Sequence, residues 1–233
     1  MKNKLTNIIG KRILSEANDL KRTISALAKE IDVDETFLKR VINGDCNLDD
    51  SYEIIIKMGS FYPIDISDLY LQNSDCENSI KIMTAQESLN SSRIFNRINK
   101  NNDQKPYYEY RDTAMSNIGP YKPEWIKELR IVDNNDPENP DVVYNNGHFL
   151  HQTTFFVGPV NFYWEVNGKK FCHEMNTGDS NYITPFWPHS FASRDSSKEA
   201  YILAVTFGGE VRRAQKELYA LGGRTEKYYL DYR

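Results

Sequence analysis

The hydrophobic pattern of this chain changes its period once, close to residue 75. Before that point apolar residues recur every three or four positions, which is the spacing of short amphipathic helices. Beyond the polar segment QNSDCENS they alternate with polar residues in short runs bounded by Gly, Asn, Asp and Pro, the pattern of strands. Two periods in one chain predict two domains, 1–74 helical and 75–233 built of strands, and hence an α+β fold class.

The first region predicts a helix-turn-helix layout. Thr23 suits the N-cap of the helix ISALAKEI, and Asp34 suits the N-cap of the next helix, which stops at Gly44. Residues 51–58 and 66–70 predict two further short helices. Such a layout serves DNA binding or, alternatively, packing and assembly. Because the region holds ten Lys and Arg against twelve Asp and Glu, and its candidate recognition helix opens on two acidic residues, we expect no DNA partner.

The second region predicts many short strands separated by Gly-marked turns, a combination that favours a small antiparallel barrel or jelly roll. The predicted strands are YYEYRDTAM, GHFLHQTTFFVG, VNFYWEV, KKFCHEM, SNYITPF and EAYILAVTF. From Glu210 onward the pattern returns to a helix, VRRAQKELYAL, which the Gly222-Gly223 pair ends.

Composition excludes several classes of protein. With 39% hydrophobic and 12% aromatic residues the chain is too apolar to be disordered. Its net charge of −4 disfavours a protein whose main partner is nucleic acid, bound through phosphate contacts. Three scattered cysteines form neither a disulfide framework nor a thiolate cluster. The start MKNKLTNIIGKRIL lacks the apolar core of a signal peptide, and no apolar run is long enough to span a bilayer. We therefore expect a soluble cytoplasmic protein with no membrane partner.

Histidines are the residues most suggestive of chemistry, and the chain has four. If GHFLHQTTFF is one continuous strand, His148 and Gln152 share a face and His151 points away. His189, on a second strand in PFWPHSF, could complete a three-residue metal site with open positions for substrate and dioxygen. For His151 and His173 we expect an ordinary structural role. Three carboxylates could add a metal ligand, although no spacing singles one out: Glu165, Glu174 and Asp179.

The segments NNGHFLHQ and TPFWPHSF, preceded by the helix-turn-helix region, resemble the phosphonate-processing cupin oxygenases over residues 10 to 210. Members include a hydroxypropylphosphonate epoxidase, a hydroxyethylphosphonate dioxygenase and an enzyme that forms methylphosphonate. The resemblance implies a helical domain joined to a cupin β-barrel, Fe(II) as the cofactor, and a homo-oligomer, expected to be a tetramer. In that oligomer a lysine from one subunit's helical domain enters a neighbour's site.

Carried over residue by residue, the resemblance assigns the metal ligands to His148, Gln152 and His189. The remaining functional positions are polar residues that would bind the phosphonate or assist the reaction. They are Asn145 of the N-x-G-H segment, the paired Tyr108 and Tyr110, Arg97 with Lys100 as its alternative, and Lys21 with Arg22 and Lys29 as alternatives.

Two departures from the family pattern narrow the expected reaction. The epoxidase has a glutamate where this chain has Gln152, and the dioxygenase takes a glutamate from a segment that here reads Ile183-Thr184-Pro185. This combination is similar to the methylphosphonate-forming branch. It implies an Fe(II)- and dioxygen-dependent oxidoreductase that cleaves the carbon–carbon bond of 2-hydroxyethylphosphonate to give methylphosphonate and carbon dioxide. Alternatives are a dioxygenase yielding hydroxymethylphosphonate and formate, a helix-turn-helix/cupin transcription regulator, and a zinc-dependent cupin isomerase.

Overall fold

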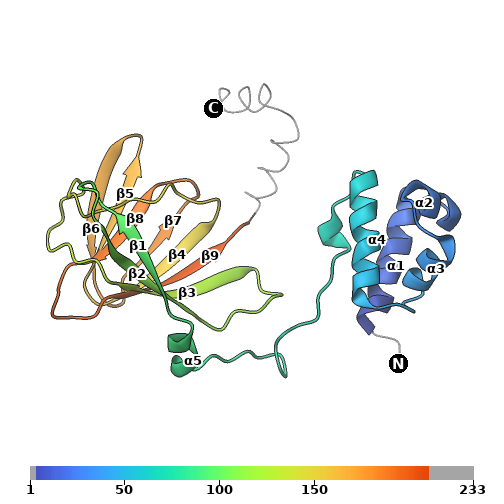
Figure 1. The fold of residues 1–233 in the computed structure, drawn as a ribbon, viewed down its shortest axis with the longest axis horizontal. Coiled ribbons are helices and arrows are strands. Elements are labelled where there is room, and N and C mark those ends of the chain that lie inside the picture. The colour runs from blue at the N-terminus through green and yellow to red at the C-terminus, as the bar shows by residue number, and fades with distance from the viewer. Residues whose placement is uncertain (1–3, 210–233) are drawn as a thin grey trace. The chain divides into compact units, whose positions relative to one another are not determined.

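The computed structural model describes residues 4–209 as two compact units, which divide between Asp75 and Cys76 (Figure 1). The expected helix VRRAQKELYAL lies outside the described residues. Within residues 4–209, no helix combines the length and the apolar character needed to cross a bilayer.

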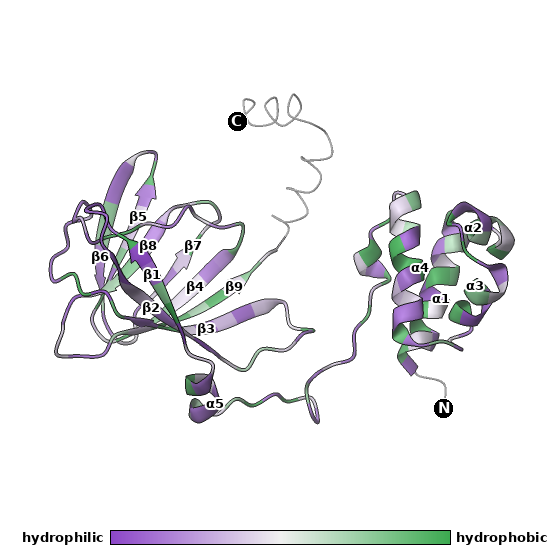
Figure 2. Ribbon diagram, in the orientation of Figure 1, coloured by the Kyte–Doolittle hydropathy of each residue, from purple (hydrophilic) through white to green (hydrophobic). Residues whose placement is uncertain are grey.

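The first unit is entirely helical. Its elements are α1 (Lys4–Asp19), α2 (Ile24–Glu30), α3 (Glu35–Ile42), α4 (Leu48–Phe61) and the short 3-10 helix η1 (Ile66–Asp68). The Thr23 and Asp34 side chains accept hydrogen bonds from the first turns of α2 and α3, which confirms both predicted caps. The apolar faces of the helices meet in one core, while their other faces are hydrophilic (Figure 2). Gly10 allows α1 to approach α3 closely, since a Cβ there would lie 2.3 Å from the Ile42 carbonyl oxygen.

The second unit consists of one short helix and antiparallel strands. Its elements are α5 (Ala85–Asn90), β1 (Arg93–Ile98), β2 (Gln104–Asp112), β3 (Tyr121–Glu128), β4 (His151–Val157), β5 (Val160–Val166), β6 (Lys169–Met175), β7 (Ser180–Ile183), β8 (His189–Ser193) and β9 (Tyr201–Phe207). The sequence pattern does not predict α5, β1 or β3 as separate elements. Charged residues interrupt the alternation in β1 and β3, which hides both strands.

Among the described residues the strands form two sheets, so of the two expected architectures the double-sheet jelly roll fits and a single closed barrel does not. One sheet has the order β1-β2-β3-β9-β4-β7 and the other the order β6-β5-β8. Side chains from both sheets, among them Phe156, Phe162 and Phe191, pack in one core between them. Burial of these large rings, and not a continuous hydrogen-bonded ladder, therefore joins the sheets.

The predicted strand GHFLHQTTFF is also shorter than expected. β4 begins at His151, and His148 lies in the bend before it. Gly147 makes this bend possible because its φ is 74°, and a Cβ there would lie 2.4 Å from the Phe186 carbonyl oxygen. His148 therefore approaches Gln152 because of the bend at Gly147 and not because of alternation along a strand.

Candidate metal centre

A cavity of about 330 Å³ in the second unit is lined by every predicted site residue except Lys21. Strands of both sheets and the segment before β4 supply its walls. The predicted residues that line it are Arg97, Tyr108, Tyr110, Asn145, His148, Gln152 and His189. Positions far apart in the sequence therefore meet in one site.

His148 and Gln152 turn two hydrogen-bond acceptors toward each other. His148 Nδ1 lies 2.8 Å from the Leu150 carbonyl oxygen, which can only accept, so Nδ1 carries the proton and Nε2 carries a lone pair. Gln152 donates its amide to Thr154 Oγ1 at 2.9 Å, which points its Oε1 at His148 Nε2, 3.2 Å away. Two lone pairs at this distance repel unless a cation lies between them. The geometry fits a shared metal ion.

His189 has the same arrangement from the opposite sheet. Its Nδ1 lies 2.9 Å from the Trp187 carbonyl oxygen, so its Nε2 also carries a lone pair. Burial lowers the pKa of His189 to about 4, which keeps the ring neutral. The His148 and His189 rings have centroids 5.0 Å apart. A backbone carbonyl on the far nitrogen is the usual support of a metal-binding histidine, so both rings are oriented as ligands.

The donor set of this site is neutral. In the part of the chain that the structure describes, no cluster of three or more His, Cys, Asp and Glu side chains could hold a metal. The site therefore depends on the amide of Gln152, which is 5% exposed. Glu165, Glu174 and Asp179 do not line the cavity. A divalent metal bound by these three donors would keep both of its positive charges, and this favours an anionic ligand beside it.

Arg97 brings a further positive charge to the same cavity. It donates to the Val143 carbonyl oxygen at 2.6 Å, and its guanidinium carbon lies 5.2 and 5.0 Å from the ring centroids of Tyr107 and Tyr108. Among residues 4–209 no carboxylate makes an ion pair with it. An unpaired guanidinium beside a neutral donor set forms a site suited to a phosphonate or another small dianion.

Tyr108 and Tyr110 have different surroundings. The Tyr108 hydroxyl accepts the backbone N–H of Phe191 at 3.0 Å and lies 3.3 Å from Ser190 Oγ, so it ties β2 to β8. The Tyr110 hydroxyl has no hydrogen-bond partner among the described residues. Burial raises the pKa of Tyr110 to about 12, so its hydroxyl keeps its proton. Tyr110 is thus the tyrosine free to donate to a ligand.

Two residues that sequence reasoning missed, Lys122 and Glu124, also line the cavity. Both point inward from β3, and the register aligns Lys122 with Thr206 of β9 and, through it, with Gln152. Glu124 lies 3.6 Å from Arg93, and burial raises the pKa of its carboxyl. The sequence signal that could have identified Lys122 and Glu124 was their two-residue spacing with Ile126, which marks one face of a strand.

The other predicted residues lie elsewhere. Lys21 is exposed in the first unit, in the turn after α1, with a φ of 60°. Lys100 is exposed and bonds Glu138. His151 stacks on Phe207 and its Nδ1 hydrogen-bonds Tyr182, and His173 is exposed on β6. Neither of these histidines lines the cavity, in agreement with the structural role expected for them.

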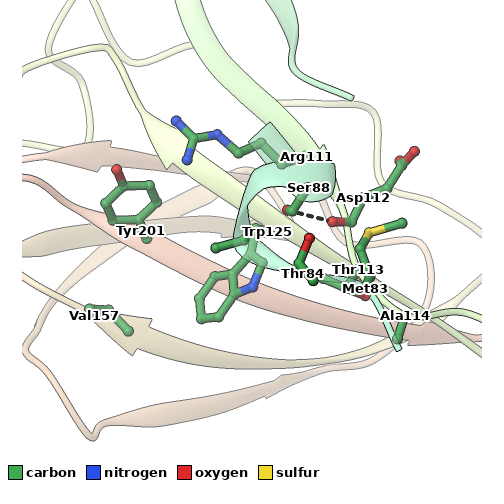
Figure 3. Close-up of a pocket in the computed structure, with 11 residues that line it drawn as sticks. Met83, Thr84, Ser88, Arg111, Asp112, Thr113, Ala114, Trp125, Val157 and Tyr201 are labelled. Carbon is green, nitrogen blue, oxygen red and sulfur yellow. Dashed lines mark hydrogen bonds between the residues drawn. The ribbon is translucent and has the colours of Figure 1, made fainter. Parts of the chain in front are cut away.

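A second cavity, of about 420 Å³, lies beside α5 and contains no comparable donor set (Figure 3). Trp125, Val157 and Tyr201 form its apolar part, and Ser88 is occupied in a hydrogen bond to the Asp112 carbonyl oxygen. Arg111, its cation, is paired with Glu109 at 2.6 Å. Among the described residues, the larger cavity thus has a paired arginine and brings together no set of metal donors.

No protein-family model matches the chain. It is 45% identical over 227 residues to methylphosphonate synthase of Nitrosopumilus maritimus (strain SCM1), a match that covers 96% of this chain and 48% of that protein. The chain thus spans about half the length of that relative.

Solved structures with a similar fold include HEPD and an epoxidase. Streptomyces albus HEPD, with 2-hydroxyethylphosphonate and Fe(II) bound, is 39% identical with a TM-score of 0.81, over 96% of this chain and 49% of that one. Hydroxypropylphosphonic acid epoxidase from S. wedmorenis is 20% identical with a TM-score of 0.60, over 87% of this chain and 98% of that one. The second likeness shows the fold alone.

Proposed function

We propose that this chain, which is 45% identical to methylphosphonate synthase and 39% identical to HEPD, belongs with the phosphonate-processing oxygenases and is the iron-binding, catalytic part of a methylphosphonate-forming enzyme. The proposed cofactor is Fe(II), held by His148, Gln152 and His189. The proposed substrates are 2-hydroxyethylphosphonate and dioxygen. One molecule of each would yield one methylphosphonate, one carbon dioxide and one water.

The observation that carries this proposal is the pair of facing acceptors, His148 Nε2 and Gln152 Oε1, 3.2 Å apart. In the tautomer that the Leu150 carbonyl selects, neither atom carries a hydrogen, so the pair favours a cation. Fe(II) is the ion bound by HEPD, which is 39% identical to this chain. When bound, Fe(II) supplies the activation of dioxygen, while the residues of the chain hold and orient the substrate.

Substrate binding would use the cavity's unpaired donors. Arg97 offers charge-assisted hydrogen bonds to the phosphonate oxygens, and Tyr110 offers its protonated hydroxyl. The Asn145 amide, which lies 3.0 Å from His189 Nε2, would turn to the substrate once that nitrogen binds a metal. Lys122 adds positive charge at the cavity wall. A dianion would thereby offset the charge that a neutral donor set leaves on iron.

The neutral ligand supports the methylphosphonate-forming reaction over its alternative. At the family's other glutamate position β7 ends at Ile183, and Ile183 pairs with Gln152 in the ladder. Thr184 follows and is exposed, so no carboxylate comes from this segment. The alternative product pair, hydroxymethylphosphonate and formate, has the same atom balance and would arise if oxygen returned to the one-carbon phosphonate fragment.

The proposal is tested by product analysis. The protein is loaded with Fe(II) under anaerobic conditions, mixed with 2-hydroxyethylphosphonate, exposed to air and examined by phosphorus NMR. We expect a methylphosphonate resonance that requires both iron and air. Hydroxymethylphosphonate as the main product would assign the chain to the alternative reaction, and a reaction that runs without air, or with zinc in place of iron, would overturn the oxygenase assignment.

A further inference from the structure

Glu128, at the end of β3, is a buried acid that the proposed chemistry does not use. Its side chain is among the buried polar groups, with 4% of the residue exposed, and neither carboxyl oxygen has a hydrogen-bond partner among residues 4–209. Leaving a buried carboxylate unpaired is unfavourable, so such a group calls for an explanation.

Glu128 lies on the face of β3 that carries cavity-lining residues. It lies on the same face of β3 as Glu124 and Ile126, both of which line the cavity. In the ladder it pairs with Tyr108 of β2, and its backbone N–H donates to the Ala200 carbonyl oxygen. Glu128 itself does not line the cavity, so it is placed behind the wall that its strand neighbours form.

Few ionisable groups surround this carboxyl. From β1, Arg97 lies over the ring of Tyr108, the β2 residue paired with Glu128, and its charge favours the charged form of Glu128. From β2, Tyr107, Tyr108 and Tyr110 are close enough for Glu128 to raise the pKa of each hydroxyl. On the β9 side the neighbours Ala200 and Ile202 carry no ionisable group. Arg97 is thus the one cation that acts on Glu128 within the described residues.

Arg97 and Glu128 are oppositely charged groups that share a buried region without an ion pair. The guanidinium of Arg97 is held by the Val143 carbonyl oxygen and the Tyr107 and Tyr108 rings, and it reaches the cavity. Burial raises the pKa of the Glu128 carboxyl well above its ordinary value, more than Arg97 lowers it. Absence of an ion pair agrees with a neutral acid, since a carboxylate would gain by contact with Arg97.

We propose that Glu128 is a positioning residue for Arg97. As the neutral acid it leaves the full charge of Arg97 available to the bound dianion, and as the carboxylate it draws Arg97 away from that dianion. This inference rests on the proposed function, because it concerns the phosphonate site. The protonation state of Glu128 would thus be a second control on substrate affinity, at a residue away from the metal ligands. Above the raised pKa of Glu128 the acid ionises, so affinity for the dianion falls as pH rises.

The test compares anaerobic binding of 2-hydroxyethylphosphonate to the Fe(II)-loaded wild-type chain and to Glu128→Gln between pH about 6 and about 10, by calorimetry. Glutamine is neutral and of the same size, so it mimics the protonated acid at every pH. We expect equal Kd values within about twofold at the low end, and a Kd about tenfold weaker in the wild type at the high end. The substrate's own ionisation affects both proteins equally.

Glu109→Gln is the matched control. Glu109 is also a β2–β3 sheet carboxylate, but it is paired with Arg111 and does not line the cavity. We expect this variant to keep the wild-type pH dependence. Infrared spectra give a second readout: we expect the protonated carboxyl band of Glu128 to persist to higher pH than the bands of exposed acids in the wild type and in Glu109→Gln, and to be missing from Glu128→Gln.

The possible outcomes distinguish the role of Glu128 from the proposed function. If the wild type binds the phosphonate and both proteins lose affinity in parallel as pH rises, the role of Glu128 is overturned and the proposed function stands. If the wild type fails to bind the phosphonate at any pH, both fall. A variant that is less stable but has the wild-type pH dependence would make Glu128 a structural residue only.

Discussion

Asn145 and His189 are joined by three hydrogen bonds. Asn145 N donates to the His189 carbonyl oxygen at 3.0 Å, His189 N donates to Asn145 Oδ1 at 2.9 Å, and Asn145 Nδ2 lies 3.0 Å from His189 Nε2. The segment before β4 is thereby fastened to the first residue of β8. One side chain positions a candidate metal ligand and also faces the place where substrate would bind.

Replacing Asn145 by Ala should therefore weaken both metal binding and turnover. The variant keeps the bond from Asn145 N but loses Asn145 Oδ1, which accepts the His189 backbone N–H, and it also loses the amide that would turn to the substrate. Loss of such outer support typically costs about 10–100-fold in metal affinity or activity. An anaerobic Fe(II) titration measures the effect, with Asn139→Ala in an outer loop as control. Equal Fe(II) affinity in both variants would contradict the positioning of His189 by Asn145.

Replacing Gln152 by Glu should separate iron binding from substrate binding. A carboxylate at this position adds a negative charge beside the metal, so we expect tighter Fe(II) binding and weaker binding of the phosphonate dianion. Fe(II) and phosphonate affinities are measured separately under anaerobic conditions. Thr154, which orients the amide through its hydroxyl, offers the control: Thr154→Val should weaken Fe(II) binding without the charge effect. A rise in both affinities for Gln152→Glu would refute the charge argument.

The two tyrosines should respond differently to loss of the hydroxyl. Tyr110→Phe is expected to raise the KM for the phosphonate about tenfold with little change in stability, because its hydroxyl is free to bind substrate. Tyr108→Phe is expected to lower the free energy of unfolding by about 1–3 kcal/mol, since the buried Phe191 N–H loses its acceptor. Denaturant unfolding and steady-state kinetics of both variants provide the comparison. If Tyr108→Phe raised the KM and Tyr110→Phe lowered the stability, the roles of the two hydroxyls would be exchanged.

Gly147 should be irreplaceable for the metal site. Gly147→Ala meets both an unfavourable φ of 74° and a contact with the Phe186 backbone, so we expect displacement of His148 and loss of Fe(II) binding. Gly168 provides a matched control because its φ is 76° and nothing lies within 4 Å of its Cβ position. Gly168→Ala should cost about 1–2 kcal/mol of strain and leave Fe(II) binding unchanged. If both alanines affect Fe(II) binding alike, the bend at Gly147 does not position His148.

Lys21 stays a prediction from the family resemblance. If it enters a neighbouring subunit's site, Lys21→Ala should lose turnover, while a mixed oligomer of Lys21→Ala and His148→Ala chains should recover part of it. Lys39→Ala, an exposed lysine of the same unit that is not among the candidates, is the control. Turnover at the full rate in Lys21→Ala would refute this role, and the oligomeric state in solution would be measured alongside by light scattering.

Much of the fold follows from local pattern. The helix caps at Thr23 and Asp34 lie where the sequence predicts them because capping depends on neighbouring backbone groups only. The strands β4, β5, β6 and β9 follow from alternation for the same reason. The sequence left a barrel and a jelly roll open, because the number of strands says nothing about whether the edges of the two sheets pair.

By itself, the sequence determined the two structural regions and the chemical types available to the site: two imidazoles, one amide, an arginine and two tyrosines. Only the tertiary structure decided their roles. The bend at Gly147, and not strand alternation, turns His148 to Gln152, and the bonds to β8 occupy Tyr108 while leaving Tyr110 free. Strand register brought Lys122 and Glu124 to the cavity and Glu128 to the buried region beside it, because the pairing of β3 with β2 and β9 joins segments that are distant in the sequence.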